Sequence, residues 1–492
     1  MAALELRRNY PGLLMTLFAL LLGILFVIFC SMYGCGGDGS GRLRENGESD
    51  EGSEEVSSGP WKRIPIAWID AGNAVNPRVR ASLDGSGKVH IVYFCGSSGA
   101  DCPGSCRYTV GYMVGHMVLN RQSPYYLRYQ IDQGPESIAR IDNCTSLTLA
   151  LTQDNCPVVA YQGGALRWCD NTEQRQSDAM ISIRESGSDI WKSWIGAEGS
   201  LEGRAVDAEA SEGGASGGDS FLKLAGNEVS AVTDSRGCIH VSYQLLSESC
   251  GASGSLISFT DLYYIKKDSS VPDAQVLAER VEEDQGDRPH FIGDHCVITL
   301  DRYDNPLIFY YAELSDQTSG QQIRGLRAAR KVGGSWKREW IEQGCEIDSI
   351  NCARFNTAGY GYAAVAYSAN EYTTGPDGIH NLRYACTDWQ FSSWQIQTVD
   401  DTAWCGEYCS LAFDSLGFPS IAYREMQGYS GYSLRGLKFA HFNGLSWDME
   451  NVSSADDIGL CNNLWLDDHN RPFICSYSST QPTIYLFYRD PP

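Results

Sequence analysis

The feature that most constrains the fold of this chain is a short unit that recurs seven times. Each copy places a turn-forming segment before a strand, which in six copies ends in an aromatic residue, as in DSLGFPSIAY, which ends at Tyr423. The corresponding positions of the seven copies are Tyr93, Tyr161, Tyr243, Tyr310, Tyr367, Tyr423 and, without an aromatic ring, Ser476. Their spacing varies from 53 to 82 residues, so the unit is constant and its connections differ in length.

The clearest copy, Tyr408 to Ser453, contains four segments with the composition of short β-strands. CSLAF and FPSIAY flank the tight-turn sequence DSLG, and LKFAHF and WDMENV flank NGLS. Such a four-stranded meander cannot bury both of its faces alone, so it needs neighbours like itself. A third strand recurs in every copy, from LRYQ at Leu127 to IYLFYR at Ile484. Tryptophan marks four of the fourth strands: Trp191, Trp336, Trp394 and Trp447.

The seventh copy has no fourth strand, and one unattached strand precedes the first copy. This strand is WKRIPIAWID, residues 61–70. Pairing it with the seventh copy would close a ring and leave no open sheet edge. We therefore predict an all-β fold for residues 61–492, a seven-bladed β-propeller of four-stranded blades in which the N-terminal strand closes the last blade.

Residues 1–60 differ in composition from the repeats. Arg7 and Arg8 precede an apolar run, Leu13–Cys30, which suits a long signal sequence and also a membrane span. MYGC, ending at Cys35, resembles a bacterial lipobox with Cys35 as the lipidated residue, although Met and Tyr depart from its usual pattern. We predict a signal peptide with lipobox, or a membrane-anchor helix, in residues 1–35, and a disordered acidic Gly/Ser linker in 36–60. Each alternative, including simple secretion, exports the propeller to the cell envelope or surface.

Net charge and cysteine content limit the kinds of ligand, disulfide and metal site that the chain can have. A net charge of −23 argues against nucleic acid and anionic membrane surfaces. Sixteen of the 18 cysteines lie beyond residue 60, which in an exported protein favours disulfides. The pairing of these cysteines stays open, although Cys156 with Cys169 and Cys461 with Cys475 are close enough in sequence to be plausible disulfide pairs. The segments CPGSC and CGEYC lack the second pair of ligands that a zinc site needs, so we expect neither metal nor cofactor.

The connections between predicted strands fall into two classes. Those between the first and second and between the third and fourth strands are short, and they share one face of a propeller. The long connections belong to the other face and contain many of the cysteines: 94–126, 198–225, 244–260, 368–380 and 424–436. Elaborated loops on a rigid scaffold are a usual place for binding, so we predict a binding face there.

Four aromatic residues in or near these loops are candidates for ligand contact: Trp404, Tyr408, Tyr429 and Tyr432. Aromatic side chains suit such contacts, and packing of loop on loop is the alternative. By contrast, His90 and His240 share one position in their blades, three residues before the aromatic, which indicates an architectural role. An aspartate nine residues before the aromatic in several copies, such as Asp84, fits a turn that bonds nearby amides, and the recurring tryptophans fit packing.

Two resemblances to known families follow from these motifs. S-L-A-F-D-S-x-G-x-P-x-I-A-Y, followed by L-K-F-A and G-x-S-W, resembles the repeat of uncharacterised bacterial exported propellers, many of them lipoproteins. The G-x-x-W turn is similar to a degenerate Asp-box of the sialidase-like superfamily, and Arg63-Ile64-Pro65 resembles the early Arg-Ile-Pro of sialidases. Sialidases would imply an arginine triad, an acid and a Tyr/Glu pair. However, Arg63 lies on the presumed closing strand, and the nearest Asp-box, 186–191, is incomplete.

Three functions remain open. We predict a surface-tethered binding or scaffold module that acts through the disulfide-braced loops of one face, with an unknown protein or glycan as its partner. A carbohydrate-active enzyme, hydrolase or lyase, would need a central pocket with two carboxylates about 5–9 Å apart. Glu407, Asp456 and Asp457 are candidates, but no hydrolase, metalloprotease, phosphate-loop or EF-hand motif identifies a catalytic residue. The third possibility is a purely structural envelope protein.

Overall fold

The fold is described from a computed structural model of the chain. The described residues are 60–69, 78–96, 108–120, 123–141, 146–163, 166–169, 172–175, 178–184, 190–194, 222–250, 256–268, 276–282, 291–315, 321–354, 363–371, 379–388, 391–402, 404–426, 436–454 and 457–489. They belong to one compact unit, Gly41–Pro492. The expected signal peptide, lipobox or anchor, the lipidation site Cys35 and the linker up to residue 59 lie outside the described residues. No helix within the described ranges is long and apolar enough to span a membrane.

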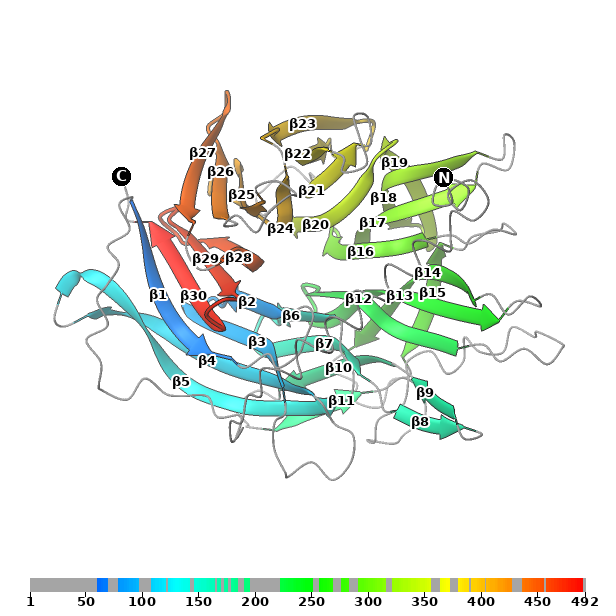
Figure 1. Ribbon diagram of the computed structural model, residues 1–492, viewed down its shortest axis with the longest axis horizontal. Helices are drawn as coiled ribbons and strands as arrows, with labels where there is room; N and C mark the ends of the chain where they lie inside the picture. Colours follow the sequence, from blue (N-terminus) through cyan, green and yellow to red (C-terminus); the bar gives the residue numbers. More distant parts are fainter. Residues whose placement is uncertain are drawn as a thin grey trace, which may run out of the picture. The chain divides into compact units, whose positions relative to one another are not determined.

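Seven antiparallel four-stranded sheets follow one another in a ring (Figure 1). The first three blades are β2 (Val79–Leu83), β3 (Lys88–Gly96), β4 (Tyr108–Asn120) and β5 (Ser123–Ile141); β6 (Leu147–Leu151), β7 (Pro157–Gly163), β10 (Asp178–Arg184) and β11 (Trp191–Trp194); and β12 (Leu222–Thr233), β13 (Cys238–Cys250), β14 (Leu256–Asp268) and β15 (Leu277–Glu282). A hairpin, β8 (Leu166–Cys169) and β9 (Thr172–Arg175), is inserted in the second blade.

The remaining four blades have the same order of strands. They are β16 (Phe291–Leu300), β17 (Pro306–Ser315), β18 (Gln322–Val332) and β19 (Ser335–Gln343); β20 (Glu346–Arg354), β21 (Ala363–Glu371), β22 (Ile379–Thr387) and β23 (Trp394–Asp400); β24 (Cys405–Phe413), β25 (Pro419–Glu425), β26 (Gly436–Phe442) and β27 (Trp447–Ser453); and β28 (Leu460–Leu466), β29 (Pro472–Ser478), β30 (Thr483–Arg489) and β1 (Trp61–Trp68). Contacts between consecutive blades are made mostly by the first strand of each, which is the innermost one.

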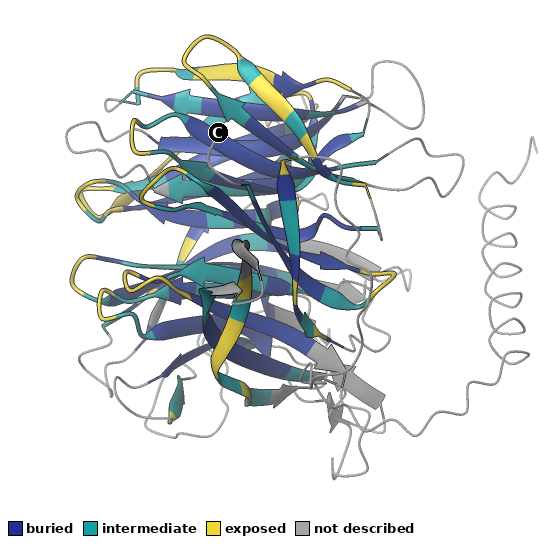
Figure 2. Cartoon of the chain, turned by 90° about the vertical axis from the view of Figure 1, so that its left-hand side faces the viewer, coloured by how far each residue is buried: buried dark blue, intermediate teal, exposed yellow. Residues whose placement is uncertain are grey.

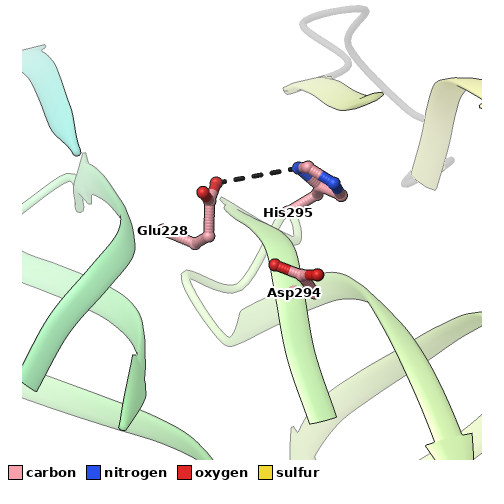
Figure 3. A group of neighbouring side chains, drawn as sticks. All are labelled: Glu228, Asp294 and His295. Atoms are coloured by element: carbon pink, nitrogen blue, oxygen red, sulfur yellow. Dashed lines mark ion pairs between the residues drawn. The ribbon is translucent and has the colours of Figure 1, made fainter. Parts of the chain in front are cut away.

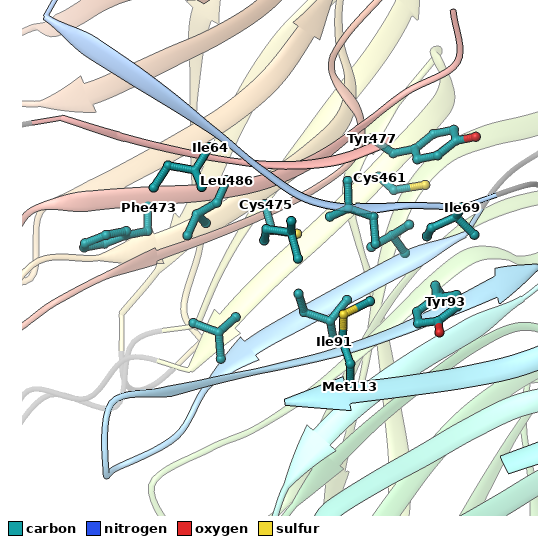
Figure 4. Close-up of a cluster of buried hydrophobic side chains, with 14 of the residues drawn as sticks. Ile64, Ile69, Ile91, Tyr93, Met113, Cys461, Phe473, Cys475, Tyr477 and Leu486 are labelled. Atoms are coloured by element: carbon teal, nitrogen blue, oxygen red, sulfur yellow. The ribbon is translucent and has the colours of Figure 1, made fainter. Parts of the chain in front are cut away.

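The ring is closed by β1, which pairs with β30 as the outermost strand of the seventh blade. Its register runs from Trp61 opposite Arg489 to Trp68 opposite Thr483. Ile64 of β1 shares one buried cluster with Leu486 of the seventh blade and Ile91 of the first (Figure 4). The seven-bladed propeller with an N-terminal closing strand, which the sequence predicts, is therefore confirmed.

The core lies between the blades. Seven clusters of buried apolar side chains are found among the described residues, one at each junction of neighbouring blades. Figure 2 shows the buried colour running through the sheets, with exposed residues at their outer edges and turns. Both faces of each blade are covered by a neighbour, which explains the strongly apolar second strands, such as β7, in which every residue is buried.

One strand assignment from the sequence is wrong. Leu127 lies in β5, the outermost strand of the first blade, and the third strand is β4, Tyr108–Asn120. The glycines of β4 gave this segment the composition of a loop, but they serve the packing. A Cβ atom on Gly111 would lie 2.5 Å from the ring of Tyr93. The expected loops 94–126 and 244–260 thus consist partly of strand, since β13 also extends to Cys250 and β14 begins at Leu256.

The repeated residues join each blade to the next. The hydroxyl group of Tyr423 donates to Asp400 of the preceding blade (2.6 Å), and Lys438 pairs with the same carboxylate (3.1 Å). Tyr310 and Tyr367 make the equivalent bonds to Glu282 and Glu342. The indole nitrogens of the repeated tryptophans likewise donate to a Glu or Gln side chain on the outermost strand of the preceding blade. These tryptophans are Trp191, Trp336, Trp394 and Trp447. Trp61 does the same to Glu450, so the closing strand behaves as an ordinary fourth strand.

The recurring aspartate organises the short turns, as the sequence predicts. Oδ1 of Asp84 accepts hydrogen bonds from the amides of Ser86 and Lys88, both 2.8 Å. Its Oδ2 contacts His90 Nε2 (3.1 Å), and Nδ1 of His90 contacts the hydroxyl group of Tyr112 (2.7 Å). Asp234, His240 and Tyr264 repeat this arrangement in the third blade. The architectural role predicted for the two histidines is confirmed.

Candidate functional site

Four of the innermost strands contain the same irregularity. In the third, fourth, sixth and seventh blades, two residues of the innermost strand are left unpaired between the partners of the second strand. The first residue of this bulge adopts a left-handed backbone conformation, with φ between 49° and 54°: Glu228, His295, Tyr408 and Cys461. Bulges redirect side chains, and positive φ is uncommon for residues other than glycine. The four residues are structurally equivalent, and each lies six positions before the aspartate of its short turn.

These bulges line a pocket on the axis of the ring. The pocket has a volume of about 360 Å³, and all seven innermost strands contribute to its wall. Its lining includes charged, amide and hydroxyl groups from different blades: Arg80, Glu228, His295, Asn351, Tyr408 and Asn463. A volume of this order admits a small polar ligand or one unit of a larger one.

Two carboxylates and an imidazole meet at the junction of the third and fourth blades (Figure 3). Glu228 on β12 and His295 on β16 point toward one another, with 3.8 Å between Oε2 and Nδ1. The other oxygen of Glu228, Oε1, is 3.6 Å from Arg78. Asp294 lies beside them, and burial raises its pKa, opposed by the charge of His295 and reinforced by that of Glu228. The group therefore contains carboxyls held in different electrostatic surroundings.

Arg80 is a charged side chain of the pocket that no described carboxylate approaches within ion-pair distance. Its guanidinium donates a hydrogen bond to the carbonyl oxygen of Val79, at 3.3 Å. Burial lowers the pKa of its guanidinium, but arginine remains protonated in proteins. The charge of Glu228 opposes this lowering but lies beyond ion-pair distance, so the desolvated guanidinium favours an anionic ligand beside it.

The remaining acids near the pocket are paired. Asp348 contacts His380 Nδ1 at 2.6 Å, and the ring of Trp404 stacks on His380 with 4.3 Å between centroids. Arg424 is 1% exposed and holds both Glu407 (3.8 Å) and Asp457 (2.5 Å). These pairs fix the wall of the pocket and leave little scope for Glu407 or Asp457 as catalytic acids.

The aromatic residues proposed from the sequence separate into three groups. Tyr408 lines the pocket, and burial raises its pKa to about 12, so its hydroxyl group is available as a donor at neutral pH. Trp404 does not belong to the lining; its ring stacks on His380, which is paired with Asp348 of the lining. Tyr429 and Tyr432, and with them Asp456, lie outside the described residues.

The expected disulfides are not found among the cysteines whose side chains the structure describes, which excludes Cys95, Cys169 and Cys250. No disulfide bond joins Cys461 to Cys475, although both are buried in the seventh blade, and Cys156 and Cys475 carry free thiols. The cysteines at 102, 106 and 144 lie outside the described residues. Arg63, which suggested a sialidase-like arginine, lies on β1 at the outer edge of the ring and stacks on Tyr485.

Sequence reasoning missed most of the pocket and the acid beside it. Arg80, Glu228 and His295 of the lining, and the neighbouring Asp294, belong to first strands, whereas binding residues were expected in the long loops. A signal was present: the position six residues before the turn aspartate holds Arg78, Glu228, His295, Tyr408 and Cys461. This variation at one position of a repeat contrasts with the constant apolar residues of the second strands.

No family model matches the chain, and no curated protein matches it either. Several solved structures are similar in fold. A protein of unknown function from Dyadobacter fermentans is 9% identical, with a TM-score of 0.43 over 88% of this chain and 100% of that one. A variant of the NanB sialidase of Streptococcus pneumoniae is 9% identical, with a TM-score of 0.42 over 88% and 95%. A PL25 ulvan lyase is 15% identical, with a TM-score of 0.38 over 76% and 78%. Likeness at this level carries nothing to the residues of the pocket.

Proposed function

We propose that the protein is an exported binding module whose site is the axial pocket. Its ligand is the acidic, hydroxyl-rich end of a glycan or a similar polar molecule. The observation that carries this proposal is the guanidinium of Arg80, which lies in the pocket without an ion pair to a described carboxylate. A planar guanidinium suits a carboxylate or sulfate group, because it can donate two parallel hydrogen bonds.

The groups around Arg80 suit hydroxyl recognition. Oδ1 of Asn351 accepts from the amide of Leu411, so Asn351 would act on a ligand chiefly as a donor. Nδ2 of Asn463 donates to the carbonyl oxygen of Cys461, so Asn463 would act chiefly as an acceptor. Tyr408 adds an aromatic face with a hydroxyl group. These side chains come from strands of the ring, so they are held in place before a ligand arrives. Preorganised groups lose less entropy on binding than groups on mobile loops. The long connections lie on the face opposite the short turns. As the sequence suggests, they would add contacts to the ligand, with Trp404, Tyr429 and Tyr432 as further candidates.

A membrane anchor or a lipid on Cys35 would tether such a module at the cell surface. This part of the proposal rests on the apolar run and on the lipobox-like segment alone. Mass spectrometry of the protein purified from membranes tests it: diacylglyceryl modification of Cys35 supports a lipid anchor. An unmodified, uncleaved N-terminus would support the helix instead.

The test of the binding site uses the full chain and a screen of acidic and neutral polysaccharides, followed by calorimetry on any that bind. Arg80→Met should weaken binding of an acidic ligand about 10- to 100-fold, because charged hydrogen bonds contribute about 1.5–3 kcal/mol. Arg302→Met is the matched control, since Arg302 is exposed on a short turn of the fourth blade. Equal affinity of the Arg80→Met variant and the wild type would refute this site.

A second candidate, a carbohydrate-active enzyme, is favoured by one observation. Glu228 of the pocket wall and the neighbouring Asp294 offer carboxylate oxygens within 4.8 Å of each other, slightly closer than the about 5–5.5 Å of retaining glycosidases, and burial raises the pKa of Asp294, as a general acid requires. Release of reducing ends or unsaturated products from a polysaccharide, lost in Glu228→Gln, would identify an enzyme. Binding without product formation would favour the binding module.

A further inference from the structure

Glycan binding through Arg80 assigns no role to the cluster of Glu228, Asp294 and His295. We propose that they form a site for one divalent cation that accepts both carboxylate oxygen and imidazole nitrogen, such as Mn²⁺ or Zn²⁺. Each residue offers one ligand atom, and these atoms all lie within 4.8 Å of one another. Mixed oxygen and nitrogen ligands suit these ions better than Mg²⁺ or Ca²⁺, which prefer oxygen alone. The inference stands whether or not the pocket binds a glycan.

The ligand atoms are too far apart to be bonded to each other and slightly farther apart than atoms around one ion. Glu228 Oε2 and His295 Nδ1 are 3.8 Å apart, which is too far for a hydrogen bond. Two atoms that bind the same ion at about 2.0–2.2 Å lie roughly 3.0–3.5 Å apart for octahedral or tetrahedral angles. A small rotation of either side chain therefore brings both atoms into bonding range.

Arg78 orients the glutamate. It contacts Oε1 of Glu228 at 3.6 Å, which leaves Oε2 directed at His295. The guanidinium would repel a cation from Oε1, so the ion is confined to the side of His295. Groups that fix a ligand in this way usually affect metal affinity strongly.

The architecture of the propeller does not require these three residues. The corresponding pair of positions holds Glu407 and Tyr408 in the sixth blade, and Leu460 and Cys461 in the seventh. The bulge therefore forms with an acid, an apolar residue, a phenol or a thiol. Within the described part of the chain, no other side chain hydrogen-bonds to Asp294, and His295 is paired with Glu228 alone. Apart from a hydrogen bond between Asp294 and the backbone of His295, the two side chains remain available to an ion.

The test is calorimetric titration of the full chain with Mn²⁺ and with Zn²⁺ after treatment with a chelator. We expect one equivalent to bind, and Glu228→Gln, Asp294→Asn and His295→Gly each to lower the affinity about 10-fold or more. Glycine is chosen for His295 because it accepts the left-handed backbone at φ 53°.

Two matched controls separate loss of a ligand from disturbance of the bulge. Glu407→Gln changes the position that corresponds to Asp294, and Cys461→Gly changes a position that corresponds to His295, with φ 54°. Both should bind the metal like the wild type, and circular dichroism should give all variants the same fold. Absence of binding up to millimolar Mn²⁺ or Zn²⁺ overturns the proposal. So does an equal loss of affinity in the control and test variants.

Discussion

Removing the indole of Trp61 should weaken the closure of the ring far more than removing that of Trp68 on the same strand. Trp61 is 2% exposed, lies edge-on to Phe439 with centroids 5.3 Å apart, and donates to Glu450 at 2.9 Å. Trp68 is 40% exposed. A buried indole removes about 200 Å² from water, which at 25 cal/mol/Å² gives an upper bound of about 5 kcal/mol.

Glu450 keeps a partner when the indole is removed, because Arg489 also pairs with it. The loss therefore consists mainly of burial and cavity terms, and Trp61→Ala should lower the free energy of unfolding by about 3–5 kcal/mol. Trp68→Ala, whose side chain is largely in water already, should cost about 1 kcal/mol or less.

Urea denaturation of both variants, followed by circular dichroism, measures this difference. Hydrogen exchange shows where the ring is weakened, because the amides of β30 should lose protection in Trp61→Ala before those of the other blades. Equal costs for the two substitutions would refute the view that β1 closes the ring as a packed fourth strand. Uniform loss of protection across all blades would refute the local effect.

Three further predictions concern the contacts between and within blades. Tyr423→Phe removes the donor to Asp400 and should lower the free energy of unfolding by about 1–3 kcal/mol in urea denaturation, whereas the exposed Tyr303→Phe should have no effect. Burial lowers the pKa of His240 from 6.5 to about 4, so the unfolded chain takes up a proton that the folded one does not, and stability should fall from pH 6.5 to pH 4 by on the order of 3 kcal/mol. Hydrogen bonds outweigh burial at Asp234 and lower its pKa from 3.8 to about 2, so the loss of stability should continue toward pH 2. If the urea midpoint of a His240→Gln variant fell as much between pH 6.5 and pH 4 as that of the wild type, His240 would not be the cause. Burial raises the pKa of the Cys405 and Cys409 thiols to about 12, so a thiol reagent should label them only in denaturant, and labelling of the native protein would show that the core opens.

The fold could be predicted because the residues that recur in each copy make the contacts between neighbouring blades. Tyr310, Tyr367 and Tyr423 recur since their hydroxyl groups bond to acids of the preceding blade. The tryptophans recur for the same reason, and Trp61 allowed the closing strand to be recognised. Such contacts recur at several junctions, so the same residue types recur at the same positions of the repeat.

The site could not be predicted in the same way. The bulge that directs Glu228 and His295 toward each other depends on pairing between strands, which single residues do not reveal. Glycines such as Gly111 suggested a loop where a strand packs against an aromatic ring. Proximity of Cys461 and Cys475 in sequence suggested a disulfide, but bond formation depends on the orientation of the two side chains.

Closure by the N-terminal strand has a consequence for how the protein is made. Trp61 emerges from the ribosome early, and its neighbours in β30 follow about 400 residues later. At about 5–20 residues per second, β1 waits roughly 20–80 s for its partner. During this time the first six blades can assemble while an apolar strand and the exposed edge of an unfinished sheet wait for the chain to be completed. Export before folding, or a chaperone that shields β1 during translation, would remove the danger of pairing with another nascent chain.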